Sequence, residues 1–342
     1  MKKSLGLLLF YLLSVAASAQ KTELPGIWNT GAGGQVYPIS AADSIHFGRI
    51  RIQKQLILVN LYAGFAVVKG EYSFANTTDQ SVNMKIGYPL SGRYTQRIVE
   101  NVFFNEPYNF RALSNGQPVK IYRLSDSGKI NLVRINNRDS SVTEISDWYV
   151  WMQEFPAGTV TTVTVYFITQ NNLARFIKGD ESRDANAFGF SLESGNAWGG
   201  KITAGQILVK LNEKLSLNNV QGILPDNELM GDMQHIQYSF SNLEPTAANN
   251  LLIWYDGAPP DYKFEKKVLP AADTLFKMID AFPLSEFNDP AFKAISRRNF
   301  TVADSGLTFS GILYFLMFFM PWIILAVVIF FLLKGKGKKK IE

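Results

Sequence analysis

Two residue types that build many functional sites are scarce in this 342-residue chain, which has no cysteine and two histidines, His46 and His235. The lack of cysteine excludes disulfide scaffolds, cysteine zinc sites, iron–sulfur clusters and thiol nucleophiles. Two histidines leave little material for a metal centre or a catalytic triad. The run from Ser191 to Gly195 does not form the G-x-S-x-G pattern of a nucleophile elbow. We therefore expect neither a catalytic set nor a cofactor.

The chain between its two ends also has almost no excess of positive over negative charge. The formal net charge is +5, from 34 Lys and Arg against 29 Asp and Glu. Lys2 and Lys3 contribute +2 and the tail after Leu333 contributes +4, so the remaining chain carries about −1. Nucleic-acid binding needs basic residues concentrated on a folded domain. The composition therefore indicates no nucleic-acid partner.

The amino-terminal residues have the pattern of a secretory signal peptide. Lys2 and Lys3 precede the largely apolar run 5–15, and Ala17-Ser18-Ala19 precedes Gln20. A basic start, a short apolar run and an A-x-A site are typical of such leaders. The pattern predicts a signal peptide over 1–19, cleaved between Ala19 and Gln20. The glycine-rich stretch that follows predicts a flexible mature N-terminus over 20–44.

The carboxy-terminal region contains 23 consecutive residues without a charge, Gly311 to Leu333. About 20 apolar residues cross a bilayer as a helix, so 311–333 predicts one C-terminal transmembrane helix, kinked at Pro321. Five lysines follow it: Lys334, Lys336, Lys338, Lys339 and Lys340. The positive-inside rule places the basic tail 334–342 in the cytoplasm and the amino-terminal part outside. The predicted partner of this segment is the lipid bilayer.

The compartment is inferred from the two ends together. The short leader with paired lysines favours a bacterial envelope, and an apolar helix favours its cytoplasmic (inner) membrane, with the large N-terminal part in the periplasm. An alternative remains open, because Lys339-Lys340-Ile341-Glu342 resembles the dilysine retrieval signal of the endoplasmic reticulum. Asn76-Thr77-Thr78 and Asn299-Phe300-Thr301 are glycosylation sequons that would fit that alternative.

Short strands separated by turn residues dominate residues 45–257. Alternating apolar residues and β-branched runs predict them, and Asn115-Gly116 predicts a tight hairpin turn. Without long amphipathic helices between strands, the fold class is mainly β, an antiparallel β-sandwich of two β units. The expected boundaries are 45–170 for the first β-sandwich domain, 171–200 for a loop or linker, and 201–257 for the second β unit. The predicted strands and hairpins cover 49–59, 62–75, 84–88, 110–124, 148–169, 202–211, 235–240 and 251–255.

Helical periodicity appears only beyond residue 270. Asp273 could cap a helix whose apolar stripe would contain Leu275, Met278, Ile279 and Phe282. Asp289-Pro290 predicts the start of a second helix, with Phe292 and Ile295 facing inward. These patterns predict that 258–306 is a linker and a short helical stalk.

Three short stretches resemble parts of uncharacterised bacterial envelope β-sandwich proteins. The stretch 66–76, followed by Tyr88-Pro89-Leu90, resembles the opening strands of VIT-type modules, in which a similar E-Y-x-F-x-N strand precedes an F-P-L turn. Residues 198–202 and 242–246 are similar to elements of other envelope domains. VIT modules usually precede an adhesive domain with a metal-ion motif, and no Asp-x-Ser-x-Ser string occurs in this chain. The resemblance implies a β architecture and no activity.

Two groups of residues are candidates for a binding site. Asp180, Glu181 and Asp184 are close enough in sequence to bind Ca²⁺, although Lys178 and Arg183 could neutralise them in a solvated loop. Exposed aromatic side chains can stack on sugars or anchor a protein partner, although in sandwiches such residues usually fill the core. The aromatic candidates are Trp148, Trp151 and Trp198.

These observations favour a non-enzymatic interaction or assembly protein, anchored in the membrane and bound to an envelope protein partner. Full export, one anchor and a tail of about nine residues fit that role. One alternative is an anchored envelope hydrolase, which would need two carboxylates about 5–10 Å apart in a concave pocket. Another is a carbohydrate- or calcium-binding module, which predicts exposed coplanar aromatics or a melting temperature that rises when Ca²⁺ is added.

Overall fold

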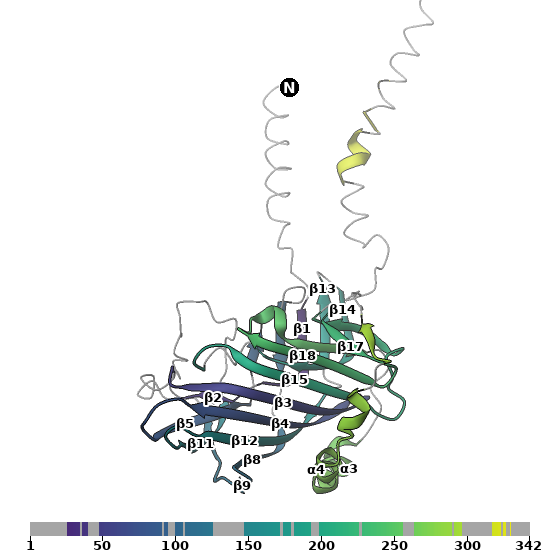
Figure 1. The fold of residues 1–342 in the computed structure, drawn as a ribbon. Coiled ribbons are helices and arrows are strands. Elements are labelled where there is room, and N and C mark those ends of the chain that lie inside the picture. The colour runs from purple at the N-terminus through teal and green to yellow at the C-terminus, as the bar shows by residue number, and fades with distance from the viewer. Residues whose placement is uncertain are drawn as a thin grey trace, which may run out of the picture. The chain divides into compact units, whose positions relative to one another are not determined.

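The structure is a computed structural model, and its residues fall into two compact units, Met1–Phe300 and Thr301–Glu342. The residues that it describes are 26–34, 36–39, 48–90, 92–94, 100–104, 107–125, 147–171, 174–178, 181–192, 198–225, 228–255, 263–288, 291–295, 317–322, 324–325 and 329. The first unit contains three β-sheets and a small group of helices (Figure 1). The expectation of a mainly β chain with antiparallel sheets is confirmed.

The largest sheet has nine strands, and its central strands β18, β15, β3, β4 and β12 run side by side in Figure 1. All neighbours are antiparallel except β15 and β3, which are parallel. In sheet order the strands are β20 (Lys293–Ile295), β17 (Leu229–Gly231), β18 (His235–Leu243), β15 (Ile202–Leu211), β3 (Ile50–Tyr62), β4 (Phe65–Asn76), β12 (Val160–Gln170), β8 (Tyr108–Ser114) and β9 (Gln117–Pro118).

The other two sheets are smaller. The four-stranded sheet has the order β10 (Tyr122–Ser125), β11 (Asp147–Phe155), β5 (Val82–Pro89) and β2 (Tyr37–Pro38). The seven-stranded sheet has the order β16 (Val220–Leu224), β19 (Leu251–Tyr255), β14 (Glu181–Phe190), β13 (Ala174–Lys178), β1 (Gly26–Gly33), β7 (Glu100–Phe104) and β6 (Gly92–Tyr94).

Strand β3 shows how the sequence fits the nine-stranded sheet. In its first half Ile50 and Ile52 are buried, whereas the residues between and after them are exposed, which is the pattern of a strand covered on one face. From Ile57 to Tyr62 a strand covered on one face would alternate between buried and exposed residues, yet all six residues are buried. Ile57, Val59 and Leu61 join the main core between the sheets, while Leu58 and Tyr62 join a second core on the opposite face. This half of the sheet is therefore covered on both faces.

The second core is closed by helices that follow the last long strands. The helical elements that close it are α3 (Phe264–Lys267), η5 (Leu269–Ala271), α4 (Ala272–Asp280) and η6 (Leu284–Asn288). A further 3-10 turn, η4 (Ala247–Asn249), lies between β18 and β19. From α4 the side chains of Ala272, Phe276 and Ile279 are buried against the sheet. The prediction of a stalk over 258–306 is therefore wrong for the residues of this range that the structure describes. Their apolar side chains pack on the apolar face of the sheet that points away from the main core.

The predicted helix from Asp273 is confirmed in outline and differs in detail. Ile279 and Phe282 are buried as expected, but Met278 is 50% exposed and Phe276 takes its place on the buried side. The N-cap residue is Ala271, which has no side-chain capping bond. Asp273 is used differently, because its carboxylate pairs with Arg111 of β8.

Most of the predicted strands are present, and both predicted turns have the backbone that their residues favour. Asn115 and Gly116 have φ values of 47° and 79° between β8 and β9, as a tight hairpin requires. Gly158 has φ 61° in the turn between β11 and β12. The strands expected over 202–211, 235–240 and 251–255 correspond to β15, β18 and β19.

Three expectations are wrong for the residues that the structure describes. The predicted loop or linker 171–200 contains β13 and β14, which pair with each other in the middle of the seven-stranded sheet, within one compact unit. The predicted flexible N-terminus 20–44 contains β1 and β2, because main-chain pairing with β13 and β5 needs no large side chains. Residues 293–295 form β20 rather than a helix, since they pair with β17; Ile295 is buried as expected.

The second unit is described at residues 317–322, 324–325 and 329, all of which are helical. Within the described parts of the chain, no helix has the length and apolar character needed to cross a bilayer. Residues 1–19 and the lysines of the tail lie outside the described residues.

The packing of α4 generates a matched pair of predictions. Replacing Ile279, which has no exposed surface, with Ala should lower the free energy of unfolding by about 2–5 kcal/mol, because it leaves a cavity under the helix. Replacing the neighbouring Met278 with Ala should change it by less than about 0.5 kcal/mol, since that side chain faces solvent. Chemical denaturation of both variants in detergent checks this; equal losses would contradict the assignment of the buried side.

Candidate functional site

The aromatic candidates from the sequence are core residues. Trp148, Trp151 and Trp198 have 0%, 1% and 1% of their surface exposed. The ring centroids of Trp198 and Phe74 are 4.5 Å apart, and the indole Nε1 of Trp198 donates a hydrogen bond to the carbonyl oxygen of Val36 at 2.6 Å. Large aromatic side chains contribute most when fully buried. None of the three presents a surface to a ligand, so their proposed role in binding is corrected to core packing.

Of the three acidic candidates, the structure describes the side chain of Asp184. Asp180 lies outside the described residues, and Glu181 and Asp184 are both on strand β14. Asp184 accepts a hydrogen bond from Nε of Arg175 at 2.7 Å, and this bond holds the pKa of its carboxyl below the ordinary value. In the described part of the chain no three His, Asp or Glu side chains are placed to hold a metal ion.

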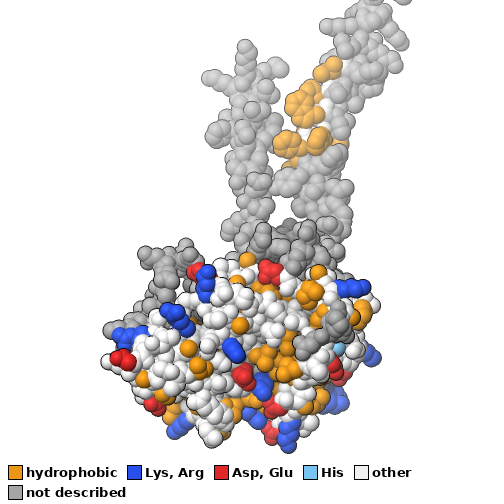
Figure 2. All heavy atoms as spheres, viewed as in Figure 1, with side chains coloured by type: hydrophobic (Ala, Val, Ile, Leu, Met, Phe, Trp, Pro, Cys, Tyr) orange, Lys and Arg blue, Asp and Glu red, His pale blue; other side chains and the backbone are white. Residues whose placement is uncertain are grey.

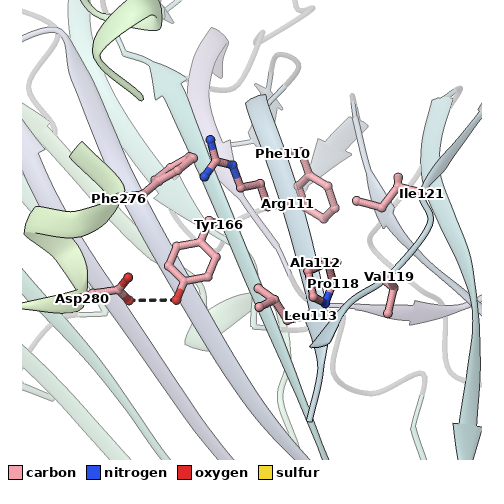
Figure 3. Close-up of a pocket in the computed structure, with 10 residues that line it drawn as sticks. All are labelled: Phe110, Arg111, Ala112, Leu113, Pro118, Val119, Ile121, Tyr166, Phe276 and Asp280. Atoms are coloured by element: carbon pink, nitrogen blue, oxygen red, sulfur yellow. Dashed lines mark hydrogen bonds between the residues drawn. The ribbon is translucent and has the colours of Figure 1, made fainter. Parts of the chain in front are cut away.

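The structure instead reveals a hollow of about 420 Å³ at the edge of strand β8, which we call the β8 hollow. Its volume is within the range of small-molecule and peptide pockets. Figure 3 shows Arg111 and Leu113 pointing toward the side of Tyr166 and Phe276, whereas Phe110 points toward Ile121 and Val119. The lining residues are Phe110, Arg111, Ala112, Leu113, Pro118, Val119, Ile121, Tyr166, Phe276 and Asp280.

The hollow exists because the chain leaves β8 soon after the hairpin turn. Strand β9 is two residues long, and Pro118 has no N–H with which to extend the ladder. The chain then continues through Val119 and Ile121 to β10, which pairs with β11 of the four-stranded sheet. On the other face, α4 closes the space by placing Phe276 and Asp280 beside Tyr166 of β12.

Asp280 is the centre of the polar end of the hollow. Its Oδ1 accepts hydrogen bonds from Nζ of Lys69 and from the hydroxyl of Tyr166, both at 2.8 Å. Burial is the largest single effect on Lys69 and would lower its pKa, but the hydrogen bond to Asp280 and the interactions with Tyr166 together outweigh it, so the pKa of Lys69 is raised. Burial and the bond to Asp280 raise the pKa of Tyr166. At neutral pH Lys69 is therefore charged and Tyr166 is neutral, and both donate to Asp280.

Arg111 occupies the middle of the hollow. Its Nη2 pairs with Asp273 of α4, and its guanidinium lies over the ring of Phe276, 4.7 Å from the centroid. Arginine carries five N–H donors, and the bond to Asp273 uses one nitrogen. The side chain remains 49% exposed. The hollow therefore combines apolar walls with one partly accessible cation.

Sequence reasoning found part of this site without recognising it. The hairpin over 110–124 and a shared face for Val119 and Ile121 follow from the strand pattern, and both residues line the hollow. The contributions of Tyr166, Phe276 and Asp280 could not be found, because they depend on how α4 packs against β12. Asp273 and Asp280 are seven residues apart, so they lie on the same side of α4. This spacing is the local sequence feature that could have indicated ion pairs on that side.

A second cluster surrounds His235, which the sequence treats as an ordinary strand histidine. Its Nδ1 lies 3.0 Å from both carboxylate oxygens of Asp232, and its Nε2 lies 2.8 Å from Oε2 of Glu286. Lys210 also donates to Oε2 of Glu286, at 2.9 Å. With both ring nitrogens engaged and 8% of the residue exposed, His235 ties η6 to strands β15 and β18 and has no nitrogen left for a substrate. His46 lies outside the described residues.

The Glu286 contacts generate a pH prediction. The bond from Lys210 is the main cause that holds the pKa of Glu286 below its usual value, against desolvation and with a further contribution from His235. A carboxyl with a depressed native pKa stabilises the fold above its unfolded pKa of about 4.3 and loses this contribution as pH falls through the native value. Glu286→Gln should lower the free energy of unfolding by about 1 kcal/mol at neutral pH.

The difference between this variant and the parent should shrink as pH falls below about 4. Urea denaturation across that range measures it. Glu154→Gln is a matched control, because Glu154 is an exposed strand residue of β11. A loss for Glu286→Gln that is independent of pH would contradict the electrostatic origin.

No protein-family model and no curated protein matches this chain. Among solved structures, it is similar to a Legionella pneumophila protein described as a "putative nutrient binding protein", with 14% identity over 84% of this chain and 96% of that chain, at a TM-score of 0.46. It is also similar to the M1 zinc metallopeptidase of Deinococcus radiodurans, with 8% identity over 60% of this chain and 42% of that chain, at a TM-score of 0.27. A third similar structure is yeast LTA4 hydrolase, with 8% identity over 70% of this chain and 31% of that chain, at a TM-score of 0.33. The chain spans less than half of the peptidase and the hydrolase, and likenesses at these levels assign it no activity.

Proposed function

We propose that this chain is an exported, single-pass membrane protein of a bacterial envelope, whose β-rich part binds a protein partner in an interaction or assembly role. The amino-terminal part would lie in the periplasm and the basic tail in the cytoplasm. The proposal joins two parts: an anchor at 311–333, and a binding surface at the β8 hollow.

One observation favours a binding role over a catalytic one. The hollow is open and mainly apolar, and the ionisable side chains that line it already have protein partners. Its single lining carboxylate, Asp280, is held by Lys69 and Tyr166, and Arg111 is paired with Asp273. Glycoside cleavage by an acid pair needs two carboxylates free to act on a substrate. The arrangement favours recognition of a partner over hydrolysis.

Exposed apolar side chains support the anchor. The described residues of the second unit are drawn as orange spheres among grey ones in Figure 2. Met317, Phe318, Phe319 and Trp322 are between 53% and 68% exposed. Large apolar surface left uncovered by protein marks an interaction site or a lipid contact. The 23 uncharged residues of 311–333 and the five lysines after them favour lipid.

The charge on the first unit supports a protein or lipid partner over nucleic acid. On the face shown in Figure 2, Lys and Arg are interspersed with Asp and Glu rather than gathered in one region. Phosphate backbones are bound by concentrated positive charge. The expectation of no nucleic-acid partner is kept in the proposal.

The anchor is tested by membrane extraction. The full chain expressed in a bacterium should stay in the pellet after alkaline carbonate washing, because transfer of about 20 apolar residues out of lipid is strongly unfavourable. A chain ending at residue 306 should be recovered in the soluble periplasmic fraction. Protease added to spheroplasts should digest the part 20–306 in the full chain; release by carbonate, or full protection from protease, would contradict the proposed placement.

The binding surface is tested by site-specific photo-crosslinking in cells. A photoreactive residue at Leu113, inside the hollow, should give one discrete adduct that mass spectrometry identifies as an envelope protein. The matched position is Gln206 on β15, which is exposed on the same sheet and separated from β8 by three strands. Adducts of equal yield at both positions, or none at Leu113, would contradict a partner at the hollow.

A further inference from the structure

The imidazole of His235 lies between two carboxylates that come from different parts of the fold. Its Nδ1 is 3.0 Å from both oxygens of Asp232, in the turn that joins β17 to β18, and its Nε2 is 2.8 Å from Oε2 of Glu286 in η6. An ionised carboxylate only accepts hydrogen bonds. Both contacts can therefore be hydrogen bonds only when both ring nitrogens carry a proton, which makes the imidazole a cation.

The charges around His235 balance when its ring is protonated. Lys210 of β15 donates to the same oxygen of Glu286 at 2.9 Å, so two cations, Lys210 and His235, meet two carboxylates, Asp232 and Glu286. On β20, which pairs with β17, Lys293 is exposed. Loss of one proton from the ring would leave the four groups with a net charge of −1.

Aromatic side chains limit the access of water to the ring. His235 has 8% of its surface exposed, and its ring centroid lies 5.0 Å from that of Phe287 and 6.1 Å from that of Phe292. Phe287 belongs to η6 and is buried in the second core. A ring nitrogen that loses its carboxylate here has little water with which to replace it, so the loss costs more than at an open surface.

The two carboxylates differ in how firmly they are held. Asp232 is fixed within its turn, because its Oδ1 accepts hydrogen bonds from the backbone N–H groups of Gln234 and His235 at 2.7 and 2.8 Å. Burial acts to raise the pKa of Asp232, but these bonds and the one from the ring of His235 outweigh it, so this pKa lies below its ordinary value. Glu286 comes from another element, and 43% of its side chain is exposed. In a neutral ring Nδ1 would therefore keep its proton for Asp232, and the lone pair of Nε2 would face Glu286.

We propose that His235 is a pH-dependent tie between the nine-stranded sheet and η6, closed by the proton on Nε2. While that proton is present, Nε2–H holds Glu286 and η6 on β18. When it leaves, the lone pair of Nε2 repels the carboxylate, and the bond from Lys210 remains. The closed state binds one proton more than the open state, so rising pH favours opening. The tie is independent of the proposed interaction function, because it lies on β18 and η6 rather than at the β8 hollow.

The protonation of the ring tests the proposal directly. The full chain, labelled with 15N at histidine and held in detergent, contains two imidazoles, and the variant His46→Gln assigns the NMR signals of His235. Both ring nitrogens of His235 should be protonated at about pH 5.5, and the proton that remains at about pH 9 should be on Nδ1. A proton on Nε2 at the higher pH would overturn the proposal, because Glu286 would then keep its contact.

Hydrogen exchange of residues 281–288 measures the opening. The backbone N–H groups of Ala281, Phe282 and Glu286 donate hydrogen bonds, so their exchange requires local opening. At about pH 6, His235→Gln should exchange there about tenfold faster than the parent, which corresponds to one hydrogen bond to a charged group. At about pH 9 the two rates should be similar, since the parent has then lost the same contact. The amides of β4 should exchange equally in both chains, which excludes general unfolding.

Glu286→Gln and His46→Gln complete the set. A glutamine amide can accept from Nε2–H and can also donate to its lone pair, so Glu286→Gln should exchange faster than the parent at about pH 6 and no faster at about pH 9. His46→Gln is the matched control and should follow the parent at both values. A ratio of rates for His235→Gln that does not change with pH, or one for His46→Gln that does, would overturn His235 as the group that controls the tie.

Discussion

The structure depends on one constraint: the middle strands of the nine-stranded sheet carry apolar side chains on both faces, and both faces must be covered. Leu58, Tyr62, Phe65 and Val67 face away from the main core. Burying a side chain of this size contributes about 1.5–3 kcal/mol, and leaving all four in water would create a large apolar patch. The helices after residue 263 supply the cover. Their packing is thus part of the β fold rather than an appendage to it.

The helical cover is fixed by polar contacts as well as apolar ones. Three of its carboxylates meet cations of the sheet: Asp273 meets Arg111, Asp280 meets Lys69, and Glu286 meets Lys210. Such exposed pairs contribute little stability individually, but together they fix where the cover sits on the sheet. Because α4 is held in this position, Phe276 and Asp280 lie beside β12 and the hollow at β8 has its outer wall. The site is therefore a consequence of closing the second core.

Local sequence signals predicted the elements that depend on local chemistry. The alternation in residues 50–59 and the β-branched run 160–166 predicted strands, and Asn115-Gly116 predicted its turn, because side-chain pattern and backbone preference act within a few residues. The segment 171–200 was misread as a loop because Asn, Gly and charged residues suggest turns. Its strands β13 and β14 are stabilised by neighbours from the beginning and the end of the unit, β1 and β19. No local pattern carries that information.

The site was less predictable than the fold for the same reason. Trp148 and Trp151 flank a turn and Trp198 lies near a glycine-rich loop, which suggested a binding role, yet all three side chains are buried. Asp289-Pro290 suggested a helix start, while residues 293–295 pair with β17 instead. The β8 hollow joins residues from 110 to 280, so it could be recognised only once α4 and β12 were in contact. The pattern of hydrophobic residues in the sequence predicted which residues are buried. Which surface remains exposed depends on contacts between segments that are far apart in the sequence.

The parallel pairing of β3 with β15 has a consequence for the order in which the chain can fold. Residues 54–61 align with 204–211, so the sheet cannot be joined at its centre until most of the chain has been synthesised. The hairpin of β3 and β4 is local and can form early, but β1 must wait for β13, which lies well downstream. Contacts between residues so far apart in sequence slow folding, because a long loop must close before they stabilise anything. During that interval the outer edge of the β3–β4 hairpin lacks β15, and exposed apolar strands of this kind are prone to aggregate unless a chaperone shields them.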